Sequence, residues 1–181
     1  MNSQKNKKKK QSNMDFRFMS FFFKIRDLVK SPMIKIKKAN IKSGNFVLDY
    51  GCGPGSFTLA AAKVVGTSGK VYAADLNPLA INKIKKITQK SGFTNIKTIL
   101  TDCNTGLGDN SIDVVICFDT FHHVNDQENL LKEFYRVLKP KSTLSLDDHH
   151  MQEDEILSKV TEQGLFELME EKDKQFLFTK K

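Results

Sequence analysis

The chain of 181 residues has no tryptophan, only three cysteines and no long hydrophobic run. No apolar stretch approaches the roughly 20 residues of a membrane-spanning helix, and no apolar signal-peptide core follows the basic N-terminus. Cys52, Cys103 and Cys117 lack C-x-x-C spacing, so neither a metal cluster nor a disulfide framework is expected. These absences favour a single cytoplasmic domain whose thiols stay reduced.

The positive charge of the chain is concentrated at its start. The formal net charge is +8, but five of the lysines lie within residues 5–10, and the remaining 24 basic and 21 acidic residues differ by only +3. We predict that residues 1–13 form a disordered lysine-rich tail. A tail of this kind can also contact nucleic acid or anionic lipid, and the sequence leaves that alternative open.

Residues 14–42 are predicted to form an N-terminal helical cap. Five of the eight residues 16–23 are phenylalanine, too many to leave in water, and a second short helix is expected over residues 33–39. The phenylalanines are expected to dock on the core. Capping a substrate pocket, or peripheral contact with a membrane surface, is the alternative.

The rest of the chain is organised around the stretch 46–57. Residues 46–49 read as a buried strand, Gly51, Gly53 and Gly55 form a turn nearly free of Cβ atoms, and an apolar helical run begins after Ser56. Glycines allow a sharp turn at positive φ and a close approach of a ligand to the main chain. The N–H groups of the following helix then point at that ligand.

Strands and helices are predicted to alternate along the remaining sequence. Further strands are expected at residues 70–75, 96–102, 111–119 and 143–147, with helices between them, and a hairpin is expected over 165–169 and 175–179. An Asn125–Glu128 capping box is expected to begin the helix that ends at Lys139-Pro140. The order predicts an α/β fold: a doubly wound, mostly parallel seven-stranded sheet with helices on both faces, spanning residues 43–181.

Acidic residues follow four successive predicted strands. Asp49, Asp75, Asp102 and Asp119 each stand at a strand end. Ligands of open α/β sheets bind at the carboxyl ends of the strands, near the point where the strand order reverses. We therefore expect these acids and the glycine turn to form one binding site, with Asp75 placed to accept both hydroxyls of a ribose.

The D-x-G-x-G-x-G pattern that begins at Asp49 resembles motif I of the class I methyltransferases that depend on S-adenosylmethionine (SAM). Residues 113–124 and 130–140 are similar to the subgroup that includes the ubiquinone and menaquinone C-methyltransferases. The resemblance covers about residues 30–181. It implies a Rossmann-like methyltransferase fold, SAM as cofactor, and in-line transfer of a methyl group to a small molecule.

The resemblance also implies which residues bind the cofactor. The methionine part would lie on the glycine loop, the ribose on Asp75, and the adenine beside Leu76 and the Asp102-Cys103 pair. The complete set is Asp49, Gly51, Cys52, Gly53, Gly55, Asp75, Leu76, Asp102, Cys103 and Phe118.

His122 and His123 are the candidate catalytic residues, because they follow the fourth strand, where the acceptor should lie. Either could act as a general base, although the pair could instead anchor the loop. The run 147–150, Asp-Asp-His-His, is a second acceptor-side group. It could be read as a magnesium site, but no metal ion is expected.

Other functions remain compatible with the sequence. The phenylalanine-rich segment favours an apolar or aromatic acceptor over nucleic acid. A nucleic-acid or protein substrate, and a SAM-binding protein without turnover, are the alternatives. A NAD-dependent oxidoreductase is disfavoured because Ser56 stands where the dinucleotide fingerprint G-x-G-x-x-G has its third glycine.

Overall fold

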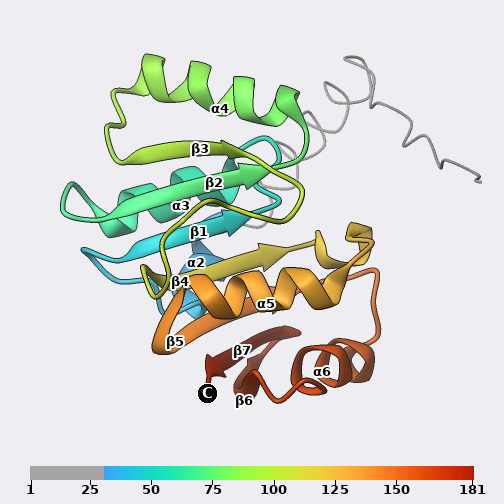
Figure 1. Cartoon of the computed structure of the whole chain (residues 1–181). Helices are drawn as coiled ribbons and strands as arrows, with labels where there is room; N and C mark the ends of the chain where they lie inside the picture. Colours follow the sequence, from blue (N-terminus) through green and yellow to red (C-terminus); the bar gives the residue numbers. More distant parts are fainter. Residues whose placement is uncertain (1–30) are drawn as a thin grey trace, which may run out of the picture.

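A computed structural model describes residues 31–181, in which seven strands form one sheet with helices on both faces (Figure 1). The lysine-rich tail and the phenylalanine-rich part of the predicted cap lie outside the described residues. The elements run in this order: α2 (Pro32–Lys38), β1 (Phe46–Tyr50), α3 (Ser56–Val65), β2 (Lys70–Asp75), α4 (Pro78–Ser91), β3 (Ile96–Leu100), β4 (Ile112–Phe118), the 3-10 helix η1 (Phe121–His123), α5 (Gln127–Val137), β5 (Leu138–Asp147), α6 (Glu153–Thr161), β6 (Phe166–Lys172) and β7 (Gln175–Lys180).

The sheet has the strand order β3-β2-β1-β4-β5-β7-β6. Strands β1 to β5 pair in parallel, whereas β7 lies between β5 and β6 and is antiparallel to both. The predicted doubly wound, mostly parallel fold is therefore confirmed. The order reverses between β1 and β4, so a ligand site is expected at the carboxyl ends of these strands.

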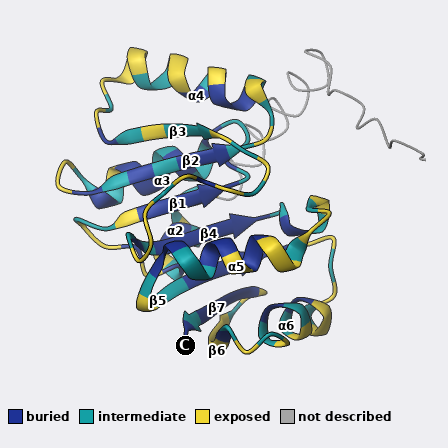
Figure 2. Ribbon diagram, in the orientation of Figure 1, coloured by how far each residue is buried: buried dark blue, intermediate teal, exposed yellow. Residues whose placement is uncertain are grey.

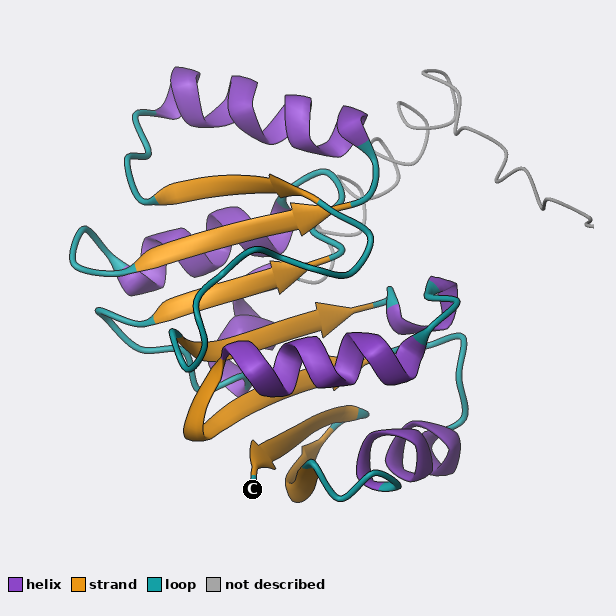
Figure 3. Ribbon diagram, in the orientation of Figure 1, coloured by secondary structure: helices purple, strands orange, loops and turns teal. Residues whose placement is uncertain are grey.

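Two helical layers bury the two faces of the sheet (Figures 2 and 3). Two consecutive residues of β2 face opposite sides of the sheet. Ala73 packs with Ile84 of α4, whereas Ala74 packs in the cluster that contains Phe134 of α5. Helices α2 and α3 cover the first face beside α4, and α6 covers the second face beside α5. None of the helices described is both long and apolar enough to cross a membrane.

The caps explain where the helices around the site begin. Asn77 Oδ1 accepts from Leu79 N (2.9 Å) at the start of α4, and Pro78 takes the first helical position. The predicted cap of α5 was wrong by one residue. Asp126 accepts from Asn129 N (3.0 Å), so Asn125 is not the cap.

Several strand boundaries also differ from the prediction, among them those of β5 and β3. β5 begins at Leu138, directly after α5, and its pairing with β4 is interrupted by a bulge before Thr143. Pro140 has no N–H for the ladder, which is why the sequence suggested that the strand starts later. β3 ends at Leu100, so Asp102 lies two residues beyond the strand.

Candidate active site

The glycine loop is held tightly against neighbouring elements. Gly51 has a φ of 76°, and a Cβ added there would lie 2.2 Å from Oγ1 of Thr120, the residue that precedes η1. Gly51 N and Cys52 N both donate to Ala74 O, at 2.8 and 3.0 Å. Gly55, with a φ of 96°, is the N-cap residue of α3. The loop therefore needs glycine for conformation at Gly51 and Gly55, and for space at Gly51.

Asp75 lies at the end of β2 and reaches the glycine loop. Its Oδ2 accepts from Gly53 N (2.9 Å) and its Oδ1 accepts from Asn77 N (2.8 Å). Burial raises the pKa of this half-buried carboxyl. The structure therefore brings Asp75 and the glycine loop together, as the sequence predicted.

Asp49 lies beneath the loop and is 2% exposed. Thr58 Oγ1 donates to its Oδ2 at 2.5 Å. Burial raises the pKa of Asp49 to about 7, and the nearby Asp75 adds to that effect. Near neutral pH the binding of a cationic ligand beside Asp49 would therefore favour the ionised form of this carboxyl.

Asp49→Asn is expected to stabilise the unliganded chain at pH 8 but not at pH 4. The folded state keeps the Asp49 proton up to about pH 7, whereas the unfolded chain loses it near pH 4. The folded state binds more protons across that window, so its stability falls as pH rises. At pH 8 we expect a melting temperature at least about 3 °C above wild type, the shift that 1 kcal/mol gives in a domain of this size.

Thermal melts of both proteins at pH 4 and pH 8 test this prediction. Asp147 contributes a slope of the same sign in both proteins and cancels in the comparison. An equal difference in melting temperature at the two pH values would show that Asp49 does not carry a raised pKa.

Apolar side chains stand exposed at the ends of β2 and β3. Leu76 is 54% exposed and Leu100 is 59% exposed, and Leu100 is the register partner of Asp75. Asp102 is exposed beyond β3, where Tyr50 Oη donates to its carbonyl oxygen (2.7 Å), and Cys103 follows half-buried. Sequence reasoning missed Leu100. Its signal was an apolar residue two positions before Asp102, at the end of the predicted strand.

Besides Asp49, two predicted cofactor residues have buried side chains. Cys52 packs with Ile81 of α4. Phe118 packs edge-to-face on Phe57, with ring centroids 4.9 Å apart. These two side chains therefore belong to the hydrophobic core beneath the loop.

The loops after β4 and β5 bring four histidines together. His122 and His123 of η1 lie beside His149 and His150, which follow β5. Neighbouring ring centroids are 3.8 Å apart for His122–His123, 4.4 Å for His122–His150 and 3.9 Å for His149–His150. Both histidine pairs that the sequence placed on the acceptor side therefore belong to one cluster. Its member His122 follows Thr120 by two residues in the sequence.

Lys35 of α2 links the N-terminal helix to the same edge of the sheet. Its Nζ lies 2.6 Å from Asp147 Oδ2 and 3.9 Å from Asp119 Oδ2. It also lies 5.1 Å from the ring centroid of Phe118. Burial raises the pKa of Asp147 to about 6 despite Lys35. Burial opposes ionisation of Asp119 as well, but Lys35 and His149 outweigh it and lower the Asp119 pKa.

Lys35→Met is expected to destabilise the chain by about 2 kcal/mol at pH 8 and by clearly less at pH 5. Removing one partner of a buried pair leaves the other charge uncompensated, although the partial exposure of Lys35 reduces the cost. At pH 5 Asp147 is largely protonated, so little of the pair remains to be lost. Urea unfolding at both pH values measures the difference. Equal losses would contradict the assigned pKa of Asp147.

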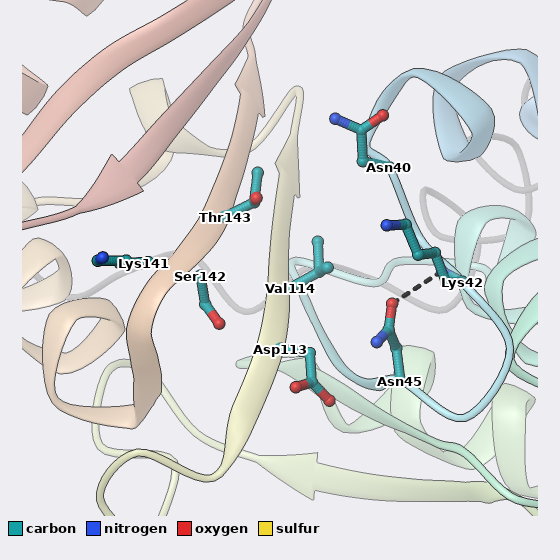
Figure 4. Close-up of a pocket in the computed structure, with 8 residues that line it drawn as sticks. All are labelled: Asn40, Lys42, Asn45, Asp113, Val114, Lys141, Ser142 and Thr143. Atoms are coloured by element: carbon teal, nitrogen blue, oxygen red, sulfur yellow. Dashed lines mark hydrogen bonds between the residues drawn. The ribbon is translucent and has the colours of Figure 1, made fainter.

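The part of the chain that the structure describes has a pocket at the far end of the sheet but no metal-binding cluster. Within residues 31–181 no group of three or more His, Cys, Asp or Glu side chains is arranged to hold a metal ion. A polar pocket of about 470 Å³ lies at the amino ends of β1 and β4 (Figure 4). Its carboxylate, Asp113, already accepts from Lys139 Nζ (2.5 Å) and Phe46 N (2.7 Å). The pocket is at the opposite end of the sheet from the glycine loop.

The carboxyl edge fits a nucleoside that carries a charged amino-acid tail. A Cβ added at Gly53 would meet only Gly51 O, at 3.9 Å, so the loop surface is open. Leu76 and Leu100 offer apolar walls, and Asp75 offers an acceptor between loop and strand. These features match the nucleoside and methionine parts of SAM.

Comparison with known proteins agrees with this geometry. A family model described as a methyltransferase domain matches residues 41–177. A demethylmenaquinone methyltransferase of Lactobacillus johnsonii is 37% identical over 112 residues, which cover 61% of this chain and 46% of that protein. A ubiquinone/menaquinone biosynthesis C-methyltransferase of a Marinomonas species is 29% identical over 136 residues, which cover 74% of this chain and 54% of that protein.

A solved structure extends the similarity to the fold. The SAM-dependent methyltransferase of Aquifex aeolicus superposes with a TM-score of 0.73 at 25% identity, covering 82% of this chain and 87% of that one. The chain spans about half the length of the curated relatives that it matches. The family match, the strand order and the glycine loop agree, and the chain therefore belongs to the class I SAM-dependent methyltransferases.

Proposed function

We propose that the chain transfers a methyl group from SAM to a small aromatic acceptor of the quinol type, at the carboxyl edge of the sheet. The observation that carries the proposal is Asp75, whose carboxylate meets Gly53 N at 2.9 Å beside the exposed Leu100. The acceptor class is supported by the names of the relatives, which methylate demethylmenaquinone or act in ubiquinone/menaquinone biosynthesis.

Different residues around the loop would bind different parts of SAM. The Gly51–Gly55 loop and Asp49 would hold the methionine part, Asp75 the ribose hydroxyls, and Leu76, Leu100 and the 102–103 pair the adenine. Bound SAM supplies an activated methyl group on a sulfonium. The chain then has to position the acceptor in line with that group and exclude water, which can supply most of the rate enhancement.

Several finer assignments belong to the same proposal. The domain boundaries at residues 13 and 42, peripheral membrane contact through the N-terminal segment, and a cytoplasmic location are predictions. A membrane-surface segment would suit a quinol acceptor, because such acceptors carry long apolar chains.

The test incubates the full chain with methyl-labelled SAM and a short-chain demethylmenaquinol, in parallel with catechol and with total RNA. Labelled quinol is the expected product. Labelled RNA would favour the nucleic-acid alternative. SAM binding without any labelled product from these acceptors would favour a protein substrate or a binding protein without turnover.

A further inference from the structure

All four histidines of the chain lie in the cluster beside the glycine loop. They come from two loops separated in the sequence, after β4 and after β5, which meet at the carboxyl edge in Figure 1. Only His122 is less than about one-third exposed, with 19% of its side chain accessible. This shielded position separates His122 from the other three rings.

Asp148 fixes the ring of His122. The Asp148 side chain is fully buried, and its Oδ2 lies 2.7 Å from His122 Nδ1. The same oxygen accepts from His122 N (3.0 Å), while Oδ1 accepts from His150 N (3.1 Å). Both oxygens of Asp148 act as acceptors for main-chain N–H groups, so the contact with the ring places the hydrogen on Nδ1. In the neutral ring the free lone pair is then on Nε2.

We propose that His122 is the general base of the reaction and that Asp148 is its positioning residue. This inference rests on the proposed function. Asp148 selects the Nδ1–H tautomer and orients the ring, so that Nε2 can take a proton from the acceptor. A buried carboxylate that orients a histidine in this way also stabilises the imidazolium that forms.

For the quinol acceptor, a hydroxyl O–H bond breaks and its proton goes to His122 Nε2. The electron pair left on oxygen moves into the ring, and a ring π pair forms the new bond from the neighbouring ring carbon to the methyl carbon. That ring carbon then loses its own hydrogen as a proton to solvent while the oxygen regains one, which restores the aromatic ring. The pair of the broken carbon–sulfur bond remains on sulfur, which becomes a neutral thioether. The imidazolium later releases its proton to solvent, which restores the base.

The other histidines lack this combination of features. The ring of His123 makes ring contacts but no hydrogen bond within the described residues, and partial burial together with His122 lowers its pKa. His149 contacts Asp119, but its side chain is 66% exposed, and Asp119 also faces Lys35. The His149–Asp119 pair is therefore a matched comparison, with the same chemistry but without shielding.

The tautomer can be measured without any acceptor. The full chain labelled with nitrogen-15 in its imidazole rings gives only four ring systems, which His→Gln variants assign. We expect His122 in the Nδ1–H form at pH 8. Asp148→Ala should abolish that preference while the His149 signals stay unchanged. Should Asp148→Ala fail to fold, the wild-type spectrum decides alone. An Nε2–H tautomer of His122 in the wild type, or an unchanged one in Asp148→Ala, would overturn the proposal.

Kinetics with the short-chain demethylmenaquinol test the catalytic role. His122→Gln should lower kcat by at least about 100-fold, as expected when a general base is lost, with the Kd for SAM within about twofold of wild type. Glu167→Gln, a change of an exposed side chain on the edge strand β6, should lower kcat by less than about threefold. A His122→Gln variant that retains its kcat would overturn the proposal. If wild type shows the expected tautomer but no turnover, the acceptor assignment fails and the His122–Asp148 geometry stands.

Discussion

Asp75→Ala is expected to weaken SAM binding by about 100-fold or more. A carboxylate that accepts two ribose hydroxyls makes two hydrogen bonds to a charged group, each contributing about 1.5–3 kcal/mol, and about 1.4 kcal/mol corresponds to a tenfold change in Kd. The substitution also removes the acceptor for Gly53 N, which fixes the glycine loop. Calorimetric titration of SAM into both proteins measures the change.

Asp154→Ala is the control for the loss of one carboxylate. Asp154 is exposed on α6, away from the glycine loop, and should leave the Kd for SAM unchanged. Melting curves of Asp75→Ala without ligand show whether the fold is retained. A folded Asp75→Ala variant that binds SAM within about threefold of wild type would refute the ribose-binding role.

Gly51→Ala is expected to destabilise the chain by about 3 kcal/mol and to abolish SAM binding. The new Cβ would stand 2.2 Å from Thr120 Oγ1, at a φ of 76° where side chains are disfavoured. Left-handed backbone costs about 1–2 kcal/mol, and overpacking costs about 1–3 kcal/mol more. Urea unfolding measures the first effect and calorimetry the second.

Two variants separate the free-energy cost of the left-handed backbone conformation from the cost of the clash with Thr120. Gly106 has a φ of 66° and open space around it, so Gly106→Ala should cost only the backbone term. Adding Thr120→Gly to Gly51→Ala removes the clashing side chain and should restore about half of the lost stability. Equal costs for Gly51→Ala and Gly106→Ala would show that Thr120 does not restrict the loop.

The main elements of the fold and the position of Asp75 beside the glycine loop could be predicted from local patterns. The glycine turn after β1, Asp75 at the end of β2 and the cap of α4 are each set within a few residues of sequence. The seven-stranded sheet follows from the alternation of these patterns. The cap of α5 was misplaced because Asn125 and Asp126 are both good capping residues, and sequence alone does not choose between adjacent candidates.

The acceptor side could not be assembled from sequence in the same way. Its contacts join residues far apart in the chain, such as Lys35 with Asp147 and His122 with Asp148. Their pairing depends on how the α2 helix and the loops after β4 and β5 meet in space. The sequence marked both histidine pairs as interesting, but only the structure shows which histidine is shielded and which carboxylate orients it.

Calorimetric titration of SAM, S-adenosylhomocysteine and NADH into the full chain tests the central claim most directly. We expect micromolar Kd values for the first two ligands and no binding of NADH, because the G-x-G-x-G loop and the Asp75–Leu100 edge suit a nucleoside with a methionine tail. The absence of binding for both SAM and S-adenosylhomocysteine would contradict the methyltransferase function, and the glycine loop would then need a different ligand.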